Sequence, residues 1–168
     1  MSAVFSTCGW GPVAPACTVP RALDHEHAAG LTHRIMGPVL YLSFPGTARR
    51  ALEFYADVFG GDLQLHTFEE FSRTDGPPDA IAHGALSGGP VSLFGSDASP
   101  DEVPVHIEGA MLSLLGTADP EVLHGWFDRL AEGGVVLDPL ALKPWGAVDG
   151  QVVDQHGLRW LIGYEPAS

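Results

Sequence analysis

The order of segments along the chain predicts an α+β fold built from two successive β-α-β-β-β units. Two helix-like segments each end at a pair of glycines, Gly60-Gly61 and Gly133-Gly134. One strand-like segment precedes each helix and three follow it. The 21 glycines and 14 prolines among 168 residues indicate many turns and short strands. Each unit alone leaves one sheet face bare, so the two sheets are expected to pair around a concave, partly closed surface that suits a small ligand.

The first unit is expected over residues 38–97. Segment 39–44 (VLYLSF) has the composition of a strand, and a helix over 46–61 follows with Thr47 as its N-cap. Residues 62–68 alternate as a strand. Segments 80–88 and 89–97 then predict a hairpin that turns at Gly88-Gly89.

The second unit is expected over residues 108–165. Its strand is predicted at 110–116 and its helix begins after Asp119, with Pro120 at the first helical position. Three strands follow, at 135–142, 150–155 and 158–164. Asp149-Gly150 predicts a turn before the second of these strands. The sequence DQHG, residues 154–157, predicts a type I turn before the last one.

The units form one domain over residues 37–168, preceded by a weakly ordered tail over 1–36. The tail has no sustained periodicity and contains several prolines. Both cysteines, Cys8 and Cys17, lie in it and make no disulfide framework. The chain shows neither signal-peptide features nor an apolar run of about 20 residues, so we expect a cytoplasmic protein.

The charge of the chain argues against two classes of partner. The formal net charge is −13, and after Met36 there are six Lys and Arg against nineteen Asp and Glu. A nucleic acid or an anionic membrane surface requires a basic face, which this composition does not supply. The excess of acidic residues is typical of a soluble protein and would attract a cationic ligand at long range.

Among the histidines, His83 is the leading candidate for chemistry. It lies within a predicted strand, in IAHGAL, and either lines a cavity as a hydrogen-bond partner or general base, or is a satisfied core residue. His66, on the neighbouring predicted strand, either faces the same cavity or is exposed at the strand edge. His106 and Glu108 in VHIEG would make a lone pair of metal ligands if the next strand began early. Serines 43, 92 and 113 show no partnership of the Ser-His-Asp kind.

Aromatic residues at strand positions form a second candidate set. Such side chains line a cavity for a flat or apolar ligand, or they belong to the core. The set comprises Tyr41, Phe44, Phe94, Trp145 and Trp160.

Three phrases of the sequence resemble a known superfamily: YLSFPGTARRALEFYADVFGG, IAHGALSGGPVSLFGSD and WFDRLAEGGVVLDPLALKPWGAVDGQVVDQHGLRW. In order and spacing they are similar to the vicinal oxygen chelate superfamily of glyoxalases, bleomycin-resistance proteins and extradiol dioxygenases, and most to its PhnB-like branch. The resemblance implies a duplicated βαβββ fold and a homodimer. In metal-using relatives it also implies His or Glu ligands on the first and fourth strand of each unit.

Carried onto this chain, those ligand positions fall at residues that do not bind metals: Tyr41, Ser92, Ala110 and Leu161. The resemblance therefore predicts a protein without metal or other cofactor that binds a small organic ligand in an aromatic cavity. The residues expected to contact the ligand are Tyr41, Ser43, His83, Phe94, Ser113, Trp145 and Trp160. Two alternatives are a metal-dependent lyase, isomerase or dioxygenase that uses His83, His106 or Glu108, and a metal-free enzyme with His83 as base.

Overall fold

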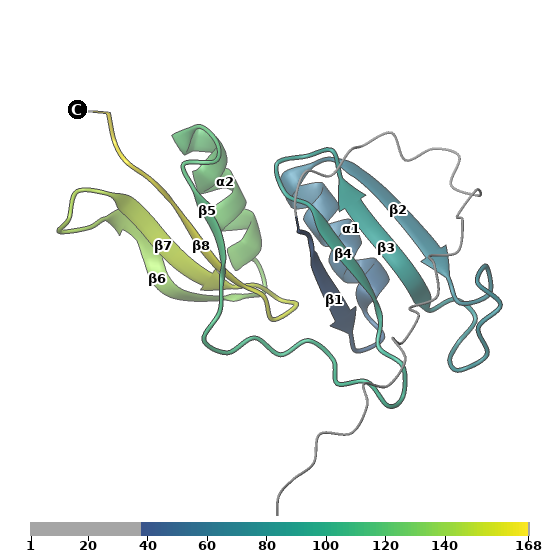
Figure 1. Cartoon of the computed structure of the whole chain (residues 1–168). Coiled ribbons are helices and arrows are strands. Elements are labelled where there is room, and N and C mark those ends of the chain that lie inside the picture. The colour runs from purple at the N-terminus through teal and green to yellow at the C-terminus, as the bar shows by residue number, and fades with distance from the viewer. Residues whose placement is uncertain (1–37, 168) are drawn as a thin grey trace, which may run out of the picture. The chain divides into compact units, whose positions relative to one another are not determined.

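A computed structural model describes residues 38–167, and the expected tail over 1–36 lies outside the described residues. The chain forms two helices and eight strands in the expected order (Figure 1). The first unit contains β1 (Leu40–Phe44), α1 (Ala48–Phe59), β2 (Asp62–Thr67), β3 (Ile81–Ser87) and β4 (Leu93–Asp97). The second unit contains β5 (Leu112–Leu115), α2 (Pro120–Ala131), β6 (Val135–Leu142), β7 (Val148–Val153) and β8 (Arg159–Tyr164).

The two units have the same topology, which confirms the duplicated βαβββ fold. The strand order is β1-β4-β3-β2 in the first sheet and β5-β8-β7-β6 in the second. The first strand of each unit is parallel to the last, and the other pairs are antiparallel. The two sheets stay separate in the described residues, with β1 and β5 at their edges, so the expected partial closure between them is not seen there. The linker that follows β4 lies along β1, where the backbone N–H of Val105 donates to the carbonyl of Ser43.

Each helix covers one face of its own sheet through an apolar stripe (Figure 1). Leu52 of α1 packs so closely on β3 that a Cβ at Gly84 would stand 2.3 Å from its Cδ1. The rings of Phe59 and Trp126 lie 5.4 Å apart, which joins α1 to α2. Both units therefore contribute to one apolar core.

The first helix begins at the predicted position with a different cap. Thr47 precedes α1 but its side chain makes no capping bond. The carboxylate of Asp97, at the end of β4, accepts the backbone N–H of Ala48 at 2.8 Å and that of Ile81 at 2.8 Å. A buried carboxylate from β4 thus accepts a free backbone N–H at the start of α1, and its negative charge suits the positive end of the helix dipole.

Asp149-Gly150 is not the turn that its composition predicts, because both residues lie within β7. The glycine has a packing role instead. A Cβ at Gly150 would stand 2.6 Å from the backbone of Leu140, next to the irregular register of β6. Glycine in a strand commonly marks such a close backbone approach.

The turn at DQHG is confirmed, and its first residue also joins the two units. Gly157 donates its N–H to the carbonyl of Asp154 at 3.0 Å. The buried Asp154 carboxylate accepts the Tyr55 hydroxyl at 2.9 Å and the Trp160 indole N–H at 2.8 Å. It also accepts the backbone N–H groups of His156 and Leu158. Burial, and then the negative charge of Asp154, raise the pKa of Tyr55.

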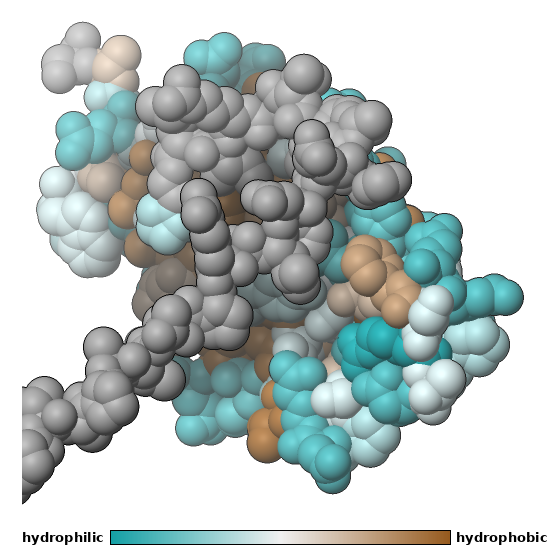
Figure 2. Space-filling model, turned by 45° about the vertical axis from the view of Figure 1, so that its right-hand side comes forward, coloured by the Kyte–Doolittle hydropathy of each residue, from teal (hydrophilic) through white to brown (hydrophobic). Residues whose placement is uncertain are grey.

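No helix of the described residues is long and apolar enough to cross a membrane. Hydrophilic residues cover most of the coloured surface in Figure 2, with apolar residues reaching the surface between them.

Candidate functional site

The face of the first sheet that α1 leaves uncovered carries four of the predicted site residues. Strand alternation sends Leu42, Leu86 and Leu93 into the core, while Tyr41 is 48% exposed. The register places Tyr41 opposite Phe94, and Ser43 is two residues further along the same face. His83 of β3 lies opposite His66 of β2 on this face. We call this surface the open face of the first sheet.

Three rings meet at the centre of the open face. The Tyr41 hydroxyl lies 3.3 Å from Nδ1 of His83, and the two rings stack with centroids 5.8 Å apart. Phe94 also contacts the imidazole, edge to face, at 5.6 Å between centroids. The imidazole therefore contacts one aromatic side chain from each of two other strands, an arrangement that offers a flat ligand both stacking and a hydrogen bond.

The surroundings of His83 favour its neutral form. Burial, and then the charge of the neighbouring His66, lower the pKa of His83. His66 itself faces the carboxylate of Glu70, with Nδ1 and Oε2 3.3 Å apart. A neutral imidazole at neutral pH can accept a proton or a hydrogen bond, as a binding site or a general base requires.

A cavity adjoins the open face at the edge of β1. It has a volume of about 480 Å³ and is lined by β1, by the linker and by the start of β5. Tyr41 and Ser43 contribute to its wall. The Ser43 hydroxyl donates a hydrogen bond to the carboxylate of Glu102 in the linker. This bond, and then the backbone N–H of Ser99, lower the pKa of Glu102.

The other three predicted ligand contacts lie away from the open face. Ser113 is an exposed residue of β5, where it pairs with Leu161 of β8. Trp145 lies in the hairpin between β6 and β7 and is 70% exposed. Trp160 is fully buried between Tyr55 and Phe59 of α1.

The donors required by the metal site of the fold family do not come together in the described residues. Over residues 38–167, no group of three or more His, Cys, Asp and Glu side chains could hold a metal ion. His106 and Glu108 face each other at 3.5 Å in the linker, where both side chains are more than three-quarters exposed. Two such donors are fewer than the three or four protein ligands of most zinc sites.

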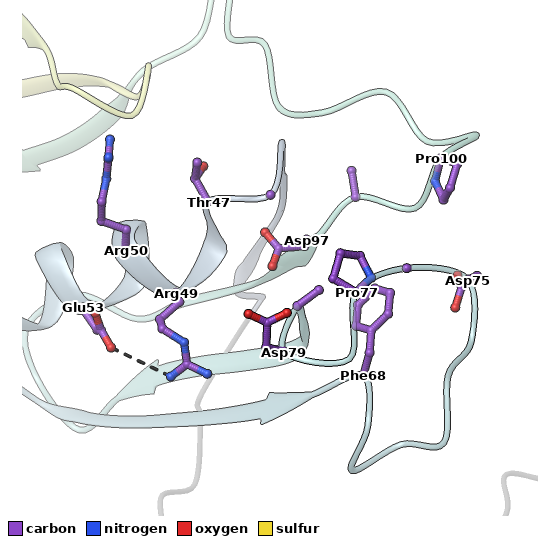
Figure 3. Close-up of a pocket in the computed structure, with 14 residues that line it drawn as sticks. Thr47, Arg49, Arg50, Glu53, Phe68, Asp75, Pro77, Asp79, Asp97 and Pro100 are labelled. Carbon is purple, nitrogen blue, oxygen red and sulfur yellow. Dashed lines mark ion pairs between the residues drawn. The ribbon is translucent and has the colours of Figure 1, made fainter.

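A second cavity lies at the start of α1 and contains charges of both signs (Figure 3). Its volume is about 590 Å³, and the segments around it are the first turn of α1, the loop between β2 and β3, and the end of β4. Arg49 lies 4.0 Å from Glu53, the ion pair dashed in Figure 3. Asp97 is already bound to two backbone N–H groups. These contacts give Arg49, Glu53 and Asp97 structural partners.

The surroundings of two polar residues, Glu102 and His156, have no signal in the sequence. Glu102 lies in a linker without periodicity, so nothing in the sequence pairs it with Ser43. His156, expected at the tip of its turn, is half-buried against Phe54 and Tyr55. Its pKa is lowered, and burial is the largest cause. These contacts depend on segments that are distant in the chain.

The fold and the sequence together define the family. The model of the Glyoxalase/Bleomycin resistance protein/Dioxygenase superfamily matches residues 39–162. The chain therefore belongs to this superfamily, as the three phrases of the sequence predict.

Several solved structures are similar to this chain. Protein PA1353 from Pseudomonas aeruginosa is 31% identical, with a TM-score of 0.65, over 78% of this chain and 98% of that one. A Bacillus cereus PhnB protein, described as a putative 3-demethylubiquinone-9 3-methyltransferase, is 20% identical with a TM-score of 0.65, over 77% and 99%. A glyoxalase-related enzyme from Fulvimarina pelagi is 21% identical with a TM-score of 0.52, over 78% and 88%. No curated protein matches the chain.

Proposed function

We propose that the protein binds a small, flat organic ligand on the open face of the first sheet, without a bound metal. One observation carries the proposal: Tyr41, His83 and Phe94 come from three strands and contact one another on a face that the core does not use. Aromatic side chains around a few polar groups are typical of small-molecule sites. The adjoining cavity of about 480 Å³ is large enough for such a ligand.

The experiment is a thermal-shift screen with flat aromatic acids, phenols and nitrogen heterocycles. A ligand that binds the folded state raises the melting temperature with concentration. His83→Ala and Phe94→Ala should each weaken binding of a hit about tenfold, which corresponds to ~1.4 kcal/mol. Asp128→Ala, on the exposed side of α2, is the control and should leave the affinity unchanged. Equal affinities for all four proteins would overturn the proposed site.

The metal-free part of the proposal has a separate test. Elemental analysis of untagged protein should find no tightly held divalent ion. About one Mn, Fe, Ni or Zn per chain would contradict the proposal and favour the metal-dependent alternative.

A second candidate is a metal-free enzyme in which His83 acts as base, since its pKa is lowered and Tyr41 orients its ring. Mass spectrometry of a bound compound after incubation separates the two. An unchanged compound supports binding, whereas a product that disappears with His83→Ala supports catalysis.

We further propose a homodimer, because the family resemblance implies one and β5 is an edge strand of the second sheet, where a second chain can pair. Light scattering should give twice the 17.8 kDa mass of the chain. A mass equal to one chain would refute the dimer. The cytoplasmic location stays a prediction from the sequence.

A further inference from the structure

The second unit has a cavity of its own, none of whose lining residues lies on the open face of the first sheet. Its volume is about 690 Å³. It is lined by the segment between β5 and α2, by the hairpin between β6 and β7, and by the end of β8 (Figure 1). Leu115, Pro120, Trp145 and Tyr164 give it an apolar and aromatic wall.

The indole of Trp145 is held at this cavity although 70% of the residue is exposed. Its Nε1–H donates to Oδ2 of Asp149 at 3.2 Å. Two backbone bonds close the hairpin beneath it, from Lys143 to Ala147 at 2.8 Å and from Gly146 to Lys143 at 2.9 Å. The hydroxyl of Tyr164 lies 3.2 Å from His124, which fixes the second ring. Both rings of the aromatic wall therefore have a hydrogen-bond partner within the second unit.

The ionisable groups that line the cavity are acidic. They are Asp149 and Glu165, and no lysine or arginine belongs to the lining formed by the described residues. The nearby Lys143 donates to Asp138 at 2.7 Å and lies 4.0 Å from Asp149. The whole chain has a formal net charge of −13, which adds to the repulsion of anions.

The equivalent place in the first unit provides an internal comparison. The cavity of Figure 3 also lies between the start of a helix, the loop joining the second and third strands, and the end of the last strand. Its lining includes Arg49 and Arg50 beside the acidic residues and contains no tryptophan. The combination of aromatic and purely acidic groups is thus a property of the second unit and not of the repeated fold.

We propose that this second cavity binds an organic cation, a quaternary or protonated amine with an apolar substituent. The cation lies against the rings of Trp145 and Tyr164, where the negative faces of aromatic rings attract positive charge. Glu165 and Asp149 supply the counter-charge, although Lys143 offsets part of the Asp149 charge from 4.0 Å, and Leu115 and Pro120 contact the apolar substituent. This site is independent of the proposed function, since it shares no residue with the open face.

The test uses two probes with the same benzyl group and opposite charge, benzyltrimethylammonium and phenylmethanesulfonate. In a ¹⁵N NMR titration the indole N–H signal of Trp145, assigned with Trp145→Phe, should shift with the ammonium ion and stay in place with the sulfonate. Equal shifts with both probes would overturn the proposal. So would an ammonium titration that moves the ring signals of His83 and not the indole of Trp145, because the cation would then bind the open face.

Two variants test the two parts of the site by calorimetry with benzyltrimethylammonium. Trp145→Leu should raise Kd at least fivefold, as expected for the loss of a cation–π contact. Asp149→Asn keeps an acceptor for the indole and removes the charge, and should raise Kd at least threefold. Leu142→Ser changes another exposed apolar residue of the same hairpin, outside the cavity lining, and should leave Kd unchanged. An unchanged Kd in both site variants, with wild-type melting temperatures, would refute the assignment.

Discussion

Replacing Tyr55 by phenylalanine tests the contact that joins the two units. The Tyr55 hydroxyl is fully buried and donates to Oδ2 of Asp154 at 2.9 Å. A hydrogen bond to a charged group contributes about 1.5–3 kcal/mol. Phenylalanine retains the ring, and Asp154 keeps its other three donors, so the loss should lie in the lower half of that range. We expect the free energy of unfolding to fall by about 2 kcal/mol.

Urea denaturation at neutral pH measures this loss, and Tyr164→Phe is its control. The Tyr164 hydroxyl lies 3.2 Å from Nε2 of the exposed His124, on the surface of the second unit. Losing a surface contact should change the stability by no more than about 0.5 kcal/mol. If the two variants lose the same stability, the Asp154 contact does not hold the units together as argued.

Alkaline pH gives an independent check of the same contact. Burial and the charge of Asp154 raise the pKa of Tyr55 in the folded protein, whereas an unfolded tyrosine ionises near pH ~10. The contribution is therefore complete below that pH and is lost as the pH rises above it, because the unfolded chain then releases a proton that the folded chain retains. The wild type should lose more stability than Tyr55→Phe between pH about 9.5 and 11. Parallel losses in both proteins would argue against a raised pKa.

Two further predictions concern the packing of the sheet and the ionisation of the open face. Gly84→Ala should lower the free energy of unfolding by about 1–3 kcal/mol, because the new methyl group would overlap Leu52. In Gly125→Ala, the control in α2, the methyl group meets no neighbour, and the variant should be more stable by up to ~1 kcal/mol. Chemical denaturation compares the pair, and a harmless Gly84→Ala would show that α1 lies further from β3. An NMR titration should give His83 a pKa below ~6.5, and His66→Gln should raise that pKa by removing a neighbouring positive charge. An unchanged pKa in His66→Gln would mean that burial alone acts on His83.

The fold follows from the sequence because its signals are local. Glycine pairs at the ends of the helices and alternating residues in the strands predict every element. Most of the predicted ends lie within one or two residues of the observed ends. The differences have local causes as well. Strand β4 begins at Leu93, later than expected, after a segment that contains Pro90, which has no N–H to donate. The pair Asp149-Gly150 has the composition of a turn, whereas in the structure Gly150 lies within β7 and lets the backbone of Leu140 approach closely.

The open face follows from the sequence only in part. Alternation places Tyr41 and Ser43 on one side of β1. The contact of His83 with Tyr41 and Phe94 requires the order β1-β4-β3-β2, in which the last strand of the unit inserts beside the first. No local pattern shows that order, and none shows that Asp154 binds Tyr55, which lies 99 residues away in the chain.

The contacts of the Asp154 carboxylate also indicate whether either half of the duplicated fold can be stable without the other. Cleavage within the linker between β4 and β5 would give two fragments, one that contains the first sheet and one that contains the second. The Tyr55 hydroxyl and the ring of Phe59 would then be bared on one fragment, and Asp154 and Trp160 on the other. Neither half should be stable alone, yet the two should reassociate when mixed, since each carries the surface that the other needs. The two halves of the repeat thus have complementary surfaces, and one half cannot replace the other.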